Sequence, residues 1–215
     1  MIAAIPLYDR FTALDAIGPY EVLWRLPGVE VRFLGPQPGV VHADTTMLGL
    51  EATHAYEDVP RPEVMMVPGG TGTRALLEDE RLLGWIRAAH EHSTWTTSVC
   101  TGSLLLGAAG VLDGLEATSH WSALDQLARF GATPVDRRVV EQGKVITAAG
   151  VSSGIDMALT LAAKVAGEDE ARAIQLRIEY DPQPPFDSGS TAKASPEVLE
   201  LARSLSTRQM RRAPV

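Results

Sequence analysis

The sequence has 215 residues, of which 45% are hydrophobic and 21% charged, with a formal net charge of −8 at pH 7 and an isoelectric point near 5.1. These proportions are typical of a globular chain that buries a large core, and they exclude a disordered one. The negative charge argues against nucleic acid or an anionic membrane as a partner, because both need a basic surface. We expect a small-molecule partner that is neutral or cationic.

Cys100 is the only cysteine, so the chain forms no internal disulfide. No signal-peptide core precedes Asp9 and Arg10, and no run reaches the roughly eighteen apolar residues of a membrane helix. These features predict a cytoplasmic protein with no membrane partner. The five histidines lack the spacing of metal ligands, so we expect no metal site.

The first half of the chain alternates between two patterns. Short β-branched runs bounded by Gly or Pro predict four strands, and helical periodicity predicts two helices between them, the first broken at Pro19. The strands are expected at Ile2–Leu7, Val29–Leu34, Val64–Val67 and Thr94–Val99, and the helices at 12–26 and 73–92.

The second half continues with a helix after Cys100, a hairpin turning at Gln142 and Gly143, and two helices meeting near Gly167. A proline-rich loop (181–190) leads to a C-terminal helix at about 195–212. Strands alternating with helices predict one α/β domain over 1–215. Its fold is a doubly wound, mostly parallel sheet with helices on both faces, a flavodoxin-like sandwich.

Three distinctive segments follow predicted strands: "YDRFTALDAIGPYE", "VPGGTGTR" and "SVCTGS". Parallel strands collect ligands at their carboxyl ends, so these segments are expected to meet. A lone cysteine is commonly a buried small hydrophobe, but this convergence favours a reactive Cys100 at the apex of a nucleophile elbow. Such a turn is expected to expose the sulfur, and the amides at the start of the following helix to favour the thiolate, which lowers the thiol pKa from about 8.5 into the range of roughly 3.5–7.5.

Other residues near these strand ends allow two interpretations each. Asp15 is either an acid beside the thiol or part of a capping box with Thr12. Gly69, Gly70 and Gly72 either only turn the chain, or this segment offers the backbone N–H groups of Gly70 and Thr71 as oxyanion donors. Thr101 and His120 are either site residues or side chains that only satisfy local hydrogen bonds.

Five segments resemble, in order and over nearly the whole chain, the ThiJ/PfpI superfamily, which has the class I glutamine amidotransferase-like fold. They are "LDAIGPYEVL", "VPGGTGTRALLED", "SVCTGSLLLGAAGVLDGLEATSHW", "TAAGVSSGIDMALTLAA" and "IEYDPQPPFDSGS". The resemblance implies a homodimer with a nucleophilic Cys100, an acidic Asp15 and a supporting hydroxyl on Thr101. An aspartate in place of the common glutamate, and Thr101 where protease-like members carry histidine, resemble the isocyanide hydratase subgroup.

The resemblance therefore implies an enzyme that hydrates an isocyanide to an N-substituted formamide through a cysteine thioimidate, with no cofactor. The organic group of the substrate needs an apolar pocket, for which Ile17, Trp121 and the loop 184–186 are candidates. Two alternatives stay open. One is a ligand sensor like the sensing half of AraC-type regulators, although no DNA-binding segment is expected here, and the other is a redox sensor that oxidises Cys100.

Overall fold

The computed structural model describes residues 1–212, with side chains described up to residue 205. The chain divides into two compact units, one ending at Ile178 and the other beginning at Glu179. That 1–215 forms a single domain stays a prediction.

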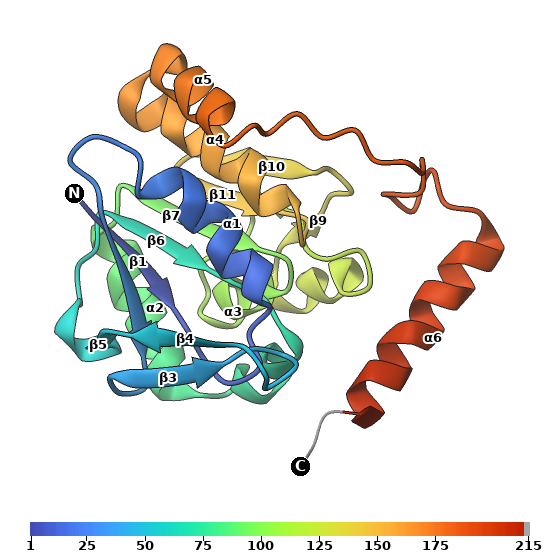
Figure 1. The fold of residues 1–215 in the computed structure, drawn as a ribbon. Helices are drawn as coiled ribbons and strands as arrows, with labels where there is room; N and C mark the ends of the chain where they lie inside the picture. The colour runs from blue at the N-terminus through green and yellow to red at the C-terminus, as the bar shows by residue number, and fades with distance from the viewer. Residues whose placement is uncertain (213–215) are drawn as a thin grey trace. The chain divides into compact units, whose positions relative to one another are not determined.

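The first unit is built on a seven-stranded sheet with the strand order β10-β11-β7-β6-β1-β2-β5. All neighbouring strands run parallel except β10, which pairs antiparallel with β11. Two smaller sheets flank it, an antiparallel β3–β4 pair and a parallel β8–β9 pair (Figure 1). The strands of the main sheet are β1 (Ile2–Pro6), β2 (Glu30–Gly35), β5 (His54–Ala55), β6 (Val64–Val67), β7 (Trp95–Val99), β10 (Val139–Gln142) and β11 (Val145–Ala148). The remaining strands are β3 (Gly39–His42), β4 (Gly49–Ala52), β8 (Glu116–Ala117) and β9 (Thr133–Pro134).

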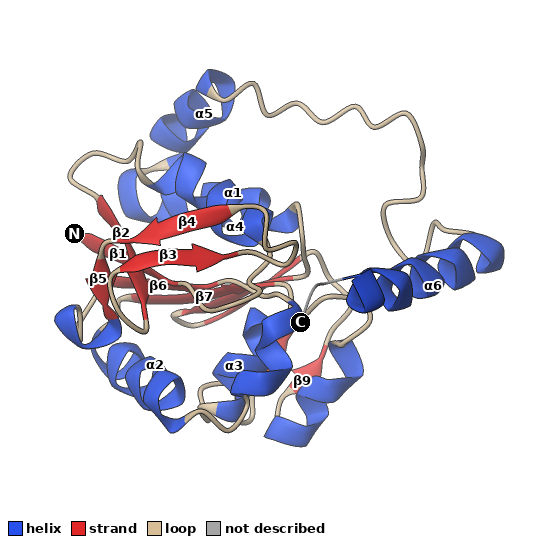
Figure 2. Ribbon diagram, turned by 60° about the horizontal axis from the view of Figure 1, so that its bottom comes forward, coloured by secondary structure: helices blue, strands red, loops and turns tan. Residues whose placement is uncertain are grey.

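Helices cover both faces of the main sheet, with α1, α4 and α5 on one side and α2 and α3 on the other (Figure 2). They are α1 (Ala13–Leu23), α2 (Glu80–His92), α3 (Gly102–Ala108), α4 (Ser153–Ala166) and α5 (Glu168–Arg177). Three 3-10 helices, η1 (Tyr56–Asp58), η2 (Thr71–Leu76) and η3 (Leu124–Phe130), complete the unit. The predicted doubly wound α/β fold is thereby confirmed.

The central strands explain why the sheet is stable. Ile5 of β1 and Met65, Met66 and Val67 of β6 are completely buried. Apolar side chains are covered on both faces of a parallel sheet, so such strands are continuous hydrophobic runs. Because β7, β6 and β1 are consecutive and parallel in the sheet, their carboxyl ends lie side by side at one edge, where the three distinctive segments begin.

Two predicted helices differ from the structure. Helix α1 runs through Pro19 without the predicted break. The residue before this proline is Gly18, which has no Cβ to clash with the proline ring. Helix α2 begins at Glu80 rather than near Thr73, because Asp79 accepts hydrogen bonds from the backbone N–H groups of the first turn.

The second unit contains the proline-rich loop and α6 (Pro196–Arg212). Val198, Leu201 and Leu205 are exposed along this helix at helical spacing. Throughout residues 1–212, every helix falls short of the length or apolar character required to cross a bilayer.

Candidate active site around Cys100

Cys100 occupies the turn between β7 and α3 with a φ of 57°. A positive φ is costly for a residue with a side chain, by about 1–3 kcal/mol, and persists only where surrounding contacts impose it. Here the backbone N–H donates to the carbonyl of Ala148 at 3.0 Å. The Cys100 carbonyl accepts from the hydroxyls of Ser103 and Ser119, each at 3.1 Å. The strained turn is therefore held by β11, by α3 and by the segment that contains Ser119.

Asp15, in the first turn of α1, is completely buried. Its Oδ2 accepts a hydrogen bond from the Gly69 N–H at 3.0 Å, whereas its Oδ1 has no partner at regular hydrogen-bond geometry among the described residues. Thr12 stands at the N-cap, but its hydroxyl donates to Asp44 instead of the helix. The capping-box interpretation of Asp15 is therefore wrong, since the carboxyl faces the Gly-rich segment.

The buried carboxyl and the buried thiol influence each other's ionisation. Burial raises the pKa of Asp15 to about 7, although the Gly69 N–H and the Cys100 thiol both act to lower it. Burial and the negative charge of Asp15 also raise the pKa of Cys100 well above its usual value, against the lowering effect of the Thr101 N–H and hydroxyl.

This result corrects two expectations from the sequence. The thiol pKa is raised rather than lowered, because burial and a carboxylate outweigh the helix N-terminus. The cysteine is also only 6% exposed, so the turn does not present an open sulfur to solvent. The thiol and the carboxyl titrate as one coupled pair, which loses its first proton near pH 7 and then retains one proton over a range of higher pH.

A chain of hydroxyl groups orients Thr101. Its Oγ1 accepts from the Gly70 N–H at 2.9 Å and lies 2.9 Å from the Thr73 hydroxyl. The Thr73 hydroxyl lies 3.0 Å from the Tyr8 hydroxyl, which donates to the carbonyl of Pro68 at 2.8 Å. Thr101, Gly70, Thr73 and Tyr8 are all buried. These hydrogen bonds therefore hold the Thr101 side chain in one orientation beside Cys100.

The amides of Gly70 and Thr71 are not free to act as oxyanion donors. The Gly70 N–H is used by Thr101, and both the N–H and the hydroxyl of Thr71 donate to Asp44, at 2.9 and 2.7 Å. The backbone N–H that acts on the sulfur is that of Thr101. The predicted donor role of Gly70 and Thr71 is thus replaced by a structural one.

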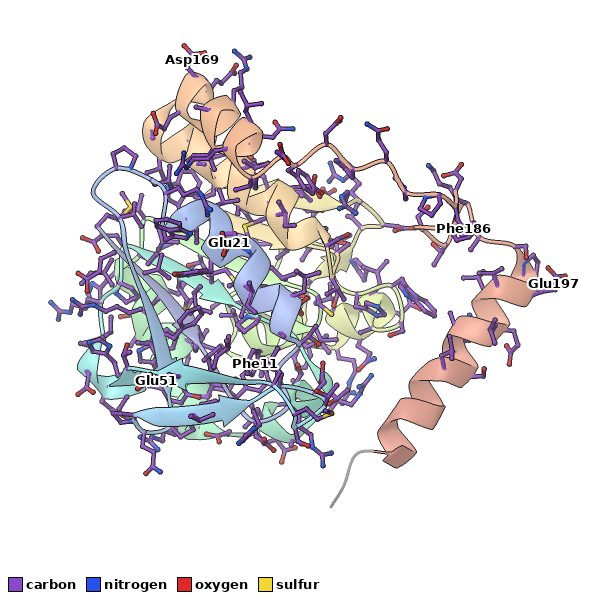
Figure 3. The ribbon with its side chains drawn as sticks, in the orientation of Figure 1. Phe11, Glu21, Glu51, Asp169, Phe186 and Glu197 are labelled. Carbon is purple, nitrogen blue, oxygen red and sulfur yellow. The ribbon has the colours of Figure 1, made fainter. Side chains whose placement is uncertain are left out.

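The remaining predicted residues have the following local surroundings. His120 Nδ1 lies 2.8 Å from the Ser122 hydroxyl, and burial lowers the pKa of the ring. Trp121 stacks at an angle on His120, with ring centroids 5.4 Å apart. Ile17 is half-buried on α1, two residues beyond Asp15. Phe186, in the second unit, is 78% exposed (Figure 3).

Two glycines allow the backbone to pass close to Asp15, Cys100 and Thr101. A Cβ on Gly69 would lie 2.5 Å from the Thr101 nitrogen and 2.9 Å from Asp15 Oδ2. Gly150 has a φ of 126°, and a Cβ there would lie 2.8 Å from the Cβ of Cys100. The sequence predicts Gly69 only as a turn residue and offers no signal for Gly150 or for Asp44.

The profile of the DJ-1/PfpI family matches residues 1–164 of the sequence. The chain belongs to this family. The resemblance noted in the sequence is confirmed. A crystal structure of a ThiJ/PfpI family protein from Pseudomonas syringae, 36% identical, superimposes with a TM-score of 0.92 over 99% of this chain and 88% of that one.

Two relatives of this DJ-1/PfpI protein carry different functional names. An isonitrile hydratase from Pseudomonas putida is 46% identical over 197 residues, which cover 92% of this chain and 86% of the relative. The HTH-type transcriptional regulator CdhR from Pseudomonas aeruginosa is 35% identical over 168 residues. That match covers 76% of this chain but only 49% of the regulator.

Proposed function

We propose that this protein is a cofactor-independent isocyanide (isonitrile) hydratase, a hydro-lyase that converts an isocyanide and water into an N-substituted formamide. One observation carries the proposal: a buried thiol on a strained turn is coupled to a buried carboxyl whose pKa is raised to about 7. The 46% identity with an isonitrile hydratase over most of both chains supports the same assignment.

In the first half of the reaction, the sulfur of Cys100 bonds to the terminal carbon of the isocyanide. The proton shared by Cys100 and Asp15 is transferred to that same carbon, and the nitrogen lone pair is restored as the triple bond becomes a C=N double bond. The product is a neutral thioimidate on Cys100, and Asp15 is left as a carboxylate.

In the second half, the Asp15 carboxylate removes a proton from a water molecule as its oxygen attacks the thioimidate carbon. Asp15 passes this proton to the substrate nitrogen and then takes the remaining hydroxyl proton. The C–S bond breaks, the sulfur leaves as a thiolate, and the formamide is released. A carboxyl that is first acid and then base requires a pKa near neutrality, which burial supplies.

Other residues are assigned supporting roles. We infer that the N–H and hydroxyl of Thr101 stabilise the thiolate, because both act to lower the pKa of Cys100. Ile17, Trp121 and His120 are proposed to contact the organic group of the substrate, and the loop 184–186 stays a further candidate. The nucleophile elbow itself is proposed from the strand–turn–helix geometry at Cys100.

The partners follow from the same assignment. We propose a small-molecule substrate and a homodimer, the latter on the family resemblance. The net charge of −8 supports our expectation that neither nucleic acid nor a membrane is a partner. A cytoplasmic location is proposed on the single cysteine, which needs no oxidising compartment.

Turnover tests the proposal. Purified protein incubated with alkyl and aryl isocyanides is expected to produce the matching formamides, followed by proton NMR of the formyl hydrogen. Cys100→Ala should abolish the product and Asp15→Asn should reduce it severely. If several isocyanides bind but none is converted, the sensor alternative replaces the enzyme.

A further inference from the structure

Asp44 lies in the loop between β3 and β4 and accepts three hydrogen bonds. Its Oδ2 accepts from the Thr12 hydroxyl at 2.5 Å. Its Oδ1 accepts from the N–H and the hydroxyl of Thr71, at 2.9 and 2.7 Å. Three bonds to one carboxylate are charge-assisted and therefore strong.

The two partners of Asp44 belong to the two segments that hold Asp15. Thr12 is the N-cap of α1, and its carbonyl accepts from the Asp15 N–H at 3.1 Å. Thr71 follows Gly69 and Gly70, whose N–H groups bond to the Asp15 carboxylate and to the Thr101 hydroxyl. One carboxylate thus joins the start of the helix that carries Asp15 to the segment that binds its side chain.

The backbone strengthens the same connection. The Asp44 N–H donates to the Phe11 carbonyl at 2.9 Å, and Phe11 forms β-bridges with both Ala43 and Gly70. Figure 3 labels Phe11 between β1 and α1, and Glu51 on β4 of the same hairpin as Asp44. Through Asp44, the β3–β4 hairpin therefore contacts the two segments that hold Asp15, and this role requires no contact between Asp44 and a substrate.

From this geometry we propose that Asp44 is a positioning residue, which holds the Asp15 carboxyl against Cys100 by joining Thr12 to Thr71. The inference rests on the function proposed above and extends it to the β3–β4 loop. Loss of the three bonds releases two segments at once, and small displacements of a reacting group cost about 10- to 100-fold in rate.

The charge of Asp44 has a measurable effect on the titration of Asp15, which a residue that only supported the fold would not have. Burial raises the pKa of Asp15 and the charge of Asp44 raises it further, whereas the Gly69 N–H and Cys100 act to lower it. Tyr8 belongs to the same cluster: burial raises the pKa of its hydroxyl, and the charges of Asp15, Cys100 and Asp44 raise it further. Removing the Asp44 charge should therefore move the first titration of the Asp15–Cys100 pair to lower pH.

The test uses the full chain and two readouts. The first is kcat/KM with an isocyanide, and the second is the pH dependence of Cys100 alkylation by iodoacetamide, which requires no turnover. Asp44→Ala is expected to lower kcat/KM about 10- to 100-fold. Asp44→Asn keeps the size of the side chain and should shift the acid limb of alkylation to lower pH.

Two further variants separate the bonds from the charge. Thr12→Val removes one hydroxyl but leaves the carboxylate, so it should lower kcat/KM while leaving the acid limb near its wild-type position. Glu51→Gln removes one carboxylate from the same hairpin, on an exposed residue, and should change neither readout.

The proposal is overturned if Asp44→Ala keeps kcat/KM within twofold of wild type. It is also overturned if turnover falls in Asp44→Ala while the alkylation profiles of both Asp44 variants match the wild type, because the residue then supports only the fold. Failure of the wild-type protein to hydrate any isocyanide refutes the proposed function instead, and the alkylation profiles still decide the role of Asp44.

Discussion

Replacing Asp15 with Asn should stabilise the folded protein at alkaline pH while it severely reduces the proposed activity. The carboxyl has an ordinary pKa of 3.8 when exposed in the unfolded chain and about 7 when buried in the folded one. This difference corresponds to about 4 kcal/mol of destabilisation once both states are ionised.

The pH dependence follows from the sign of the difference. The folded carboxyl holds its proton more tightly than the unfolded one, so the destabilisation is absent below about pH 4 and grows as the pH rises to about 7. Above that pH it is constant. Asn carries no charge, but a buried amide NH₂ in place of Oδ1, which has no partner at regular hydrogen-bond geometry among the described residues, costs about 1–3 kcal/mol. The net gain for Asp15→Asn is then about 1–3 kcal/mol at pH 8.5 and about zero at pH 5.

Urea unfolding followed by tryptophan fluorescence at both pH values measures this gain. Glu51→Gln serves as the control, since it removes an exposed carboxylate and should leave the free energy of unfolding unchanged within about 0.5 kcal/mol. The reasoning is refuted if Asp15→Asn is no more stable than wild type at pH 8.5, or if its stability difference from wild type is the same at both pH values.

Cys100→Ser should lower turnover at least about a thousandfold, because a serine hydroxyl ionises far less readily than a thiol, and product NMR measures the loss. Gly69→Ala should destabilise the fold by about 1–3 kcal/mol and reduce turnover, since its methyl group would lie 2.5 Å from the Thr101 nitrogen. Gly150→Ala should do the same, because its φ of 126° is strained for any side chain and its Cβ would meet Cys100. Gly84→Ala on α2, whose nearest neighbour would be 3.8 Å away, is the matched control and should keep wild-type activity. The kcat/KM profile should rise through an acid limb near pH 7, as the catalytic pair loses its first proton; a flat profile from pH 5 to 9 would contradict the assigned pKa.

The sequence predicts most of the main sheet, because strands such as β1 and β6 are apolar runs with clear ends, whereas the two-residue strand β5 gives no such signal and is missed. Val64–Val67 is predicted with its observed bounds, and the hairpin at Gln142 and Gly143 is confirmed by the β10–β11 pairing. The β3–β4 pair has no such signal. Its two strands are only four residues long and neither alternates cleanly between apolar and polar residues, so the loop that carries Asp44 is missed.

The sequence predicts which residues form the candidate site better than it predicts their pKa shifts. Placing Cys100 after β7 and Asp15 after β1 at the same edge of the sheet, with β6 between the two strands, requires only that the three strands are parallel. The direction of the thiol pKa depends on how completely the turn is buried and on the charge of Asp15, which sequence spacing does not specify. The hydrogen-bond partners of Gly70 and Thr71 likewise depend on tertiary contacts, with Thr101 in one case and Asp44 in the other.

The central claim is that Cys100 bonds covalently to the isocyanide carbon with a proton delivered through Asp15. Rapid acid quenching of the protein during turnover, followed by mass spectrometry of the peptide that contains Cys100, tests it directly. The account predicts a mass increase equal to one intact isocyanide on Cys100 during turnover, and its absence once the substrate is exhausted. Formamide production by the Cys100→Ala variant, or rapid turnover with an unmodified Cys100 at every quench time, would contradict it.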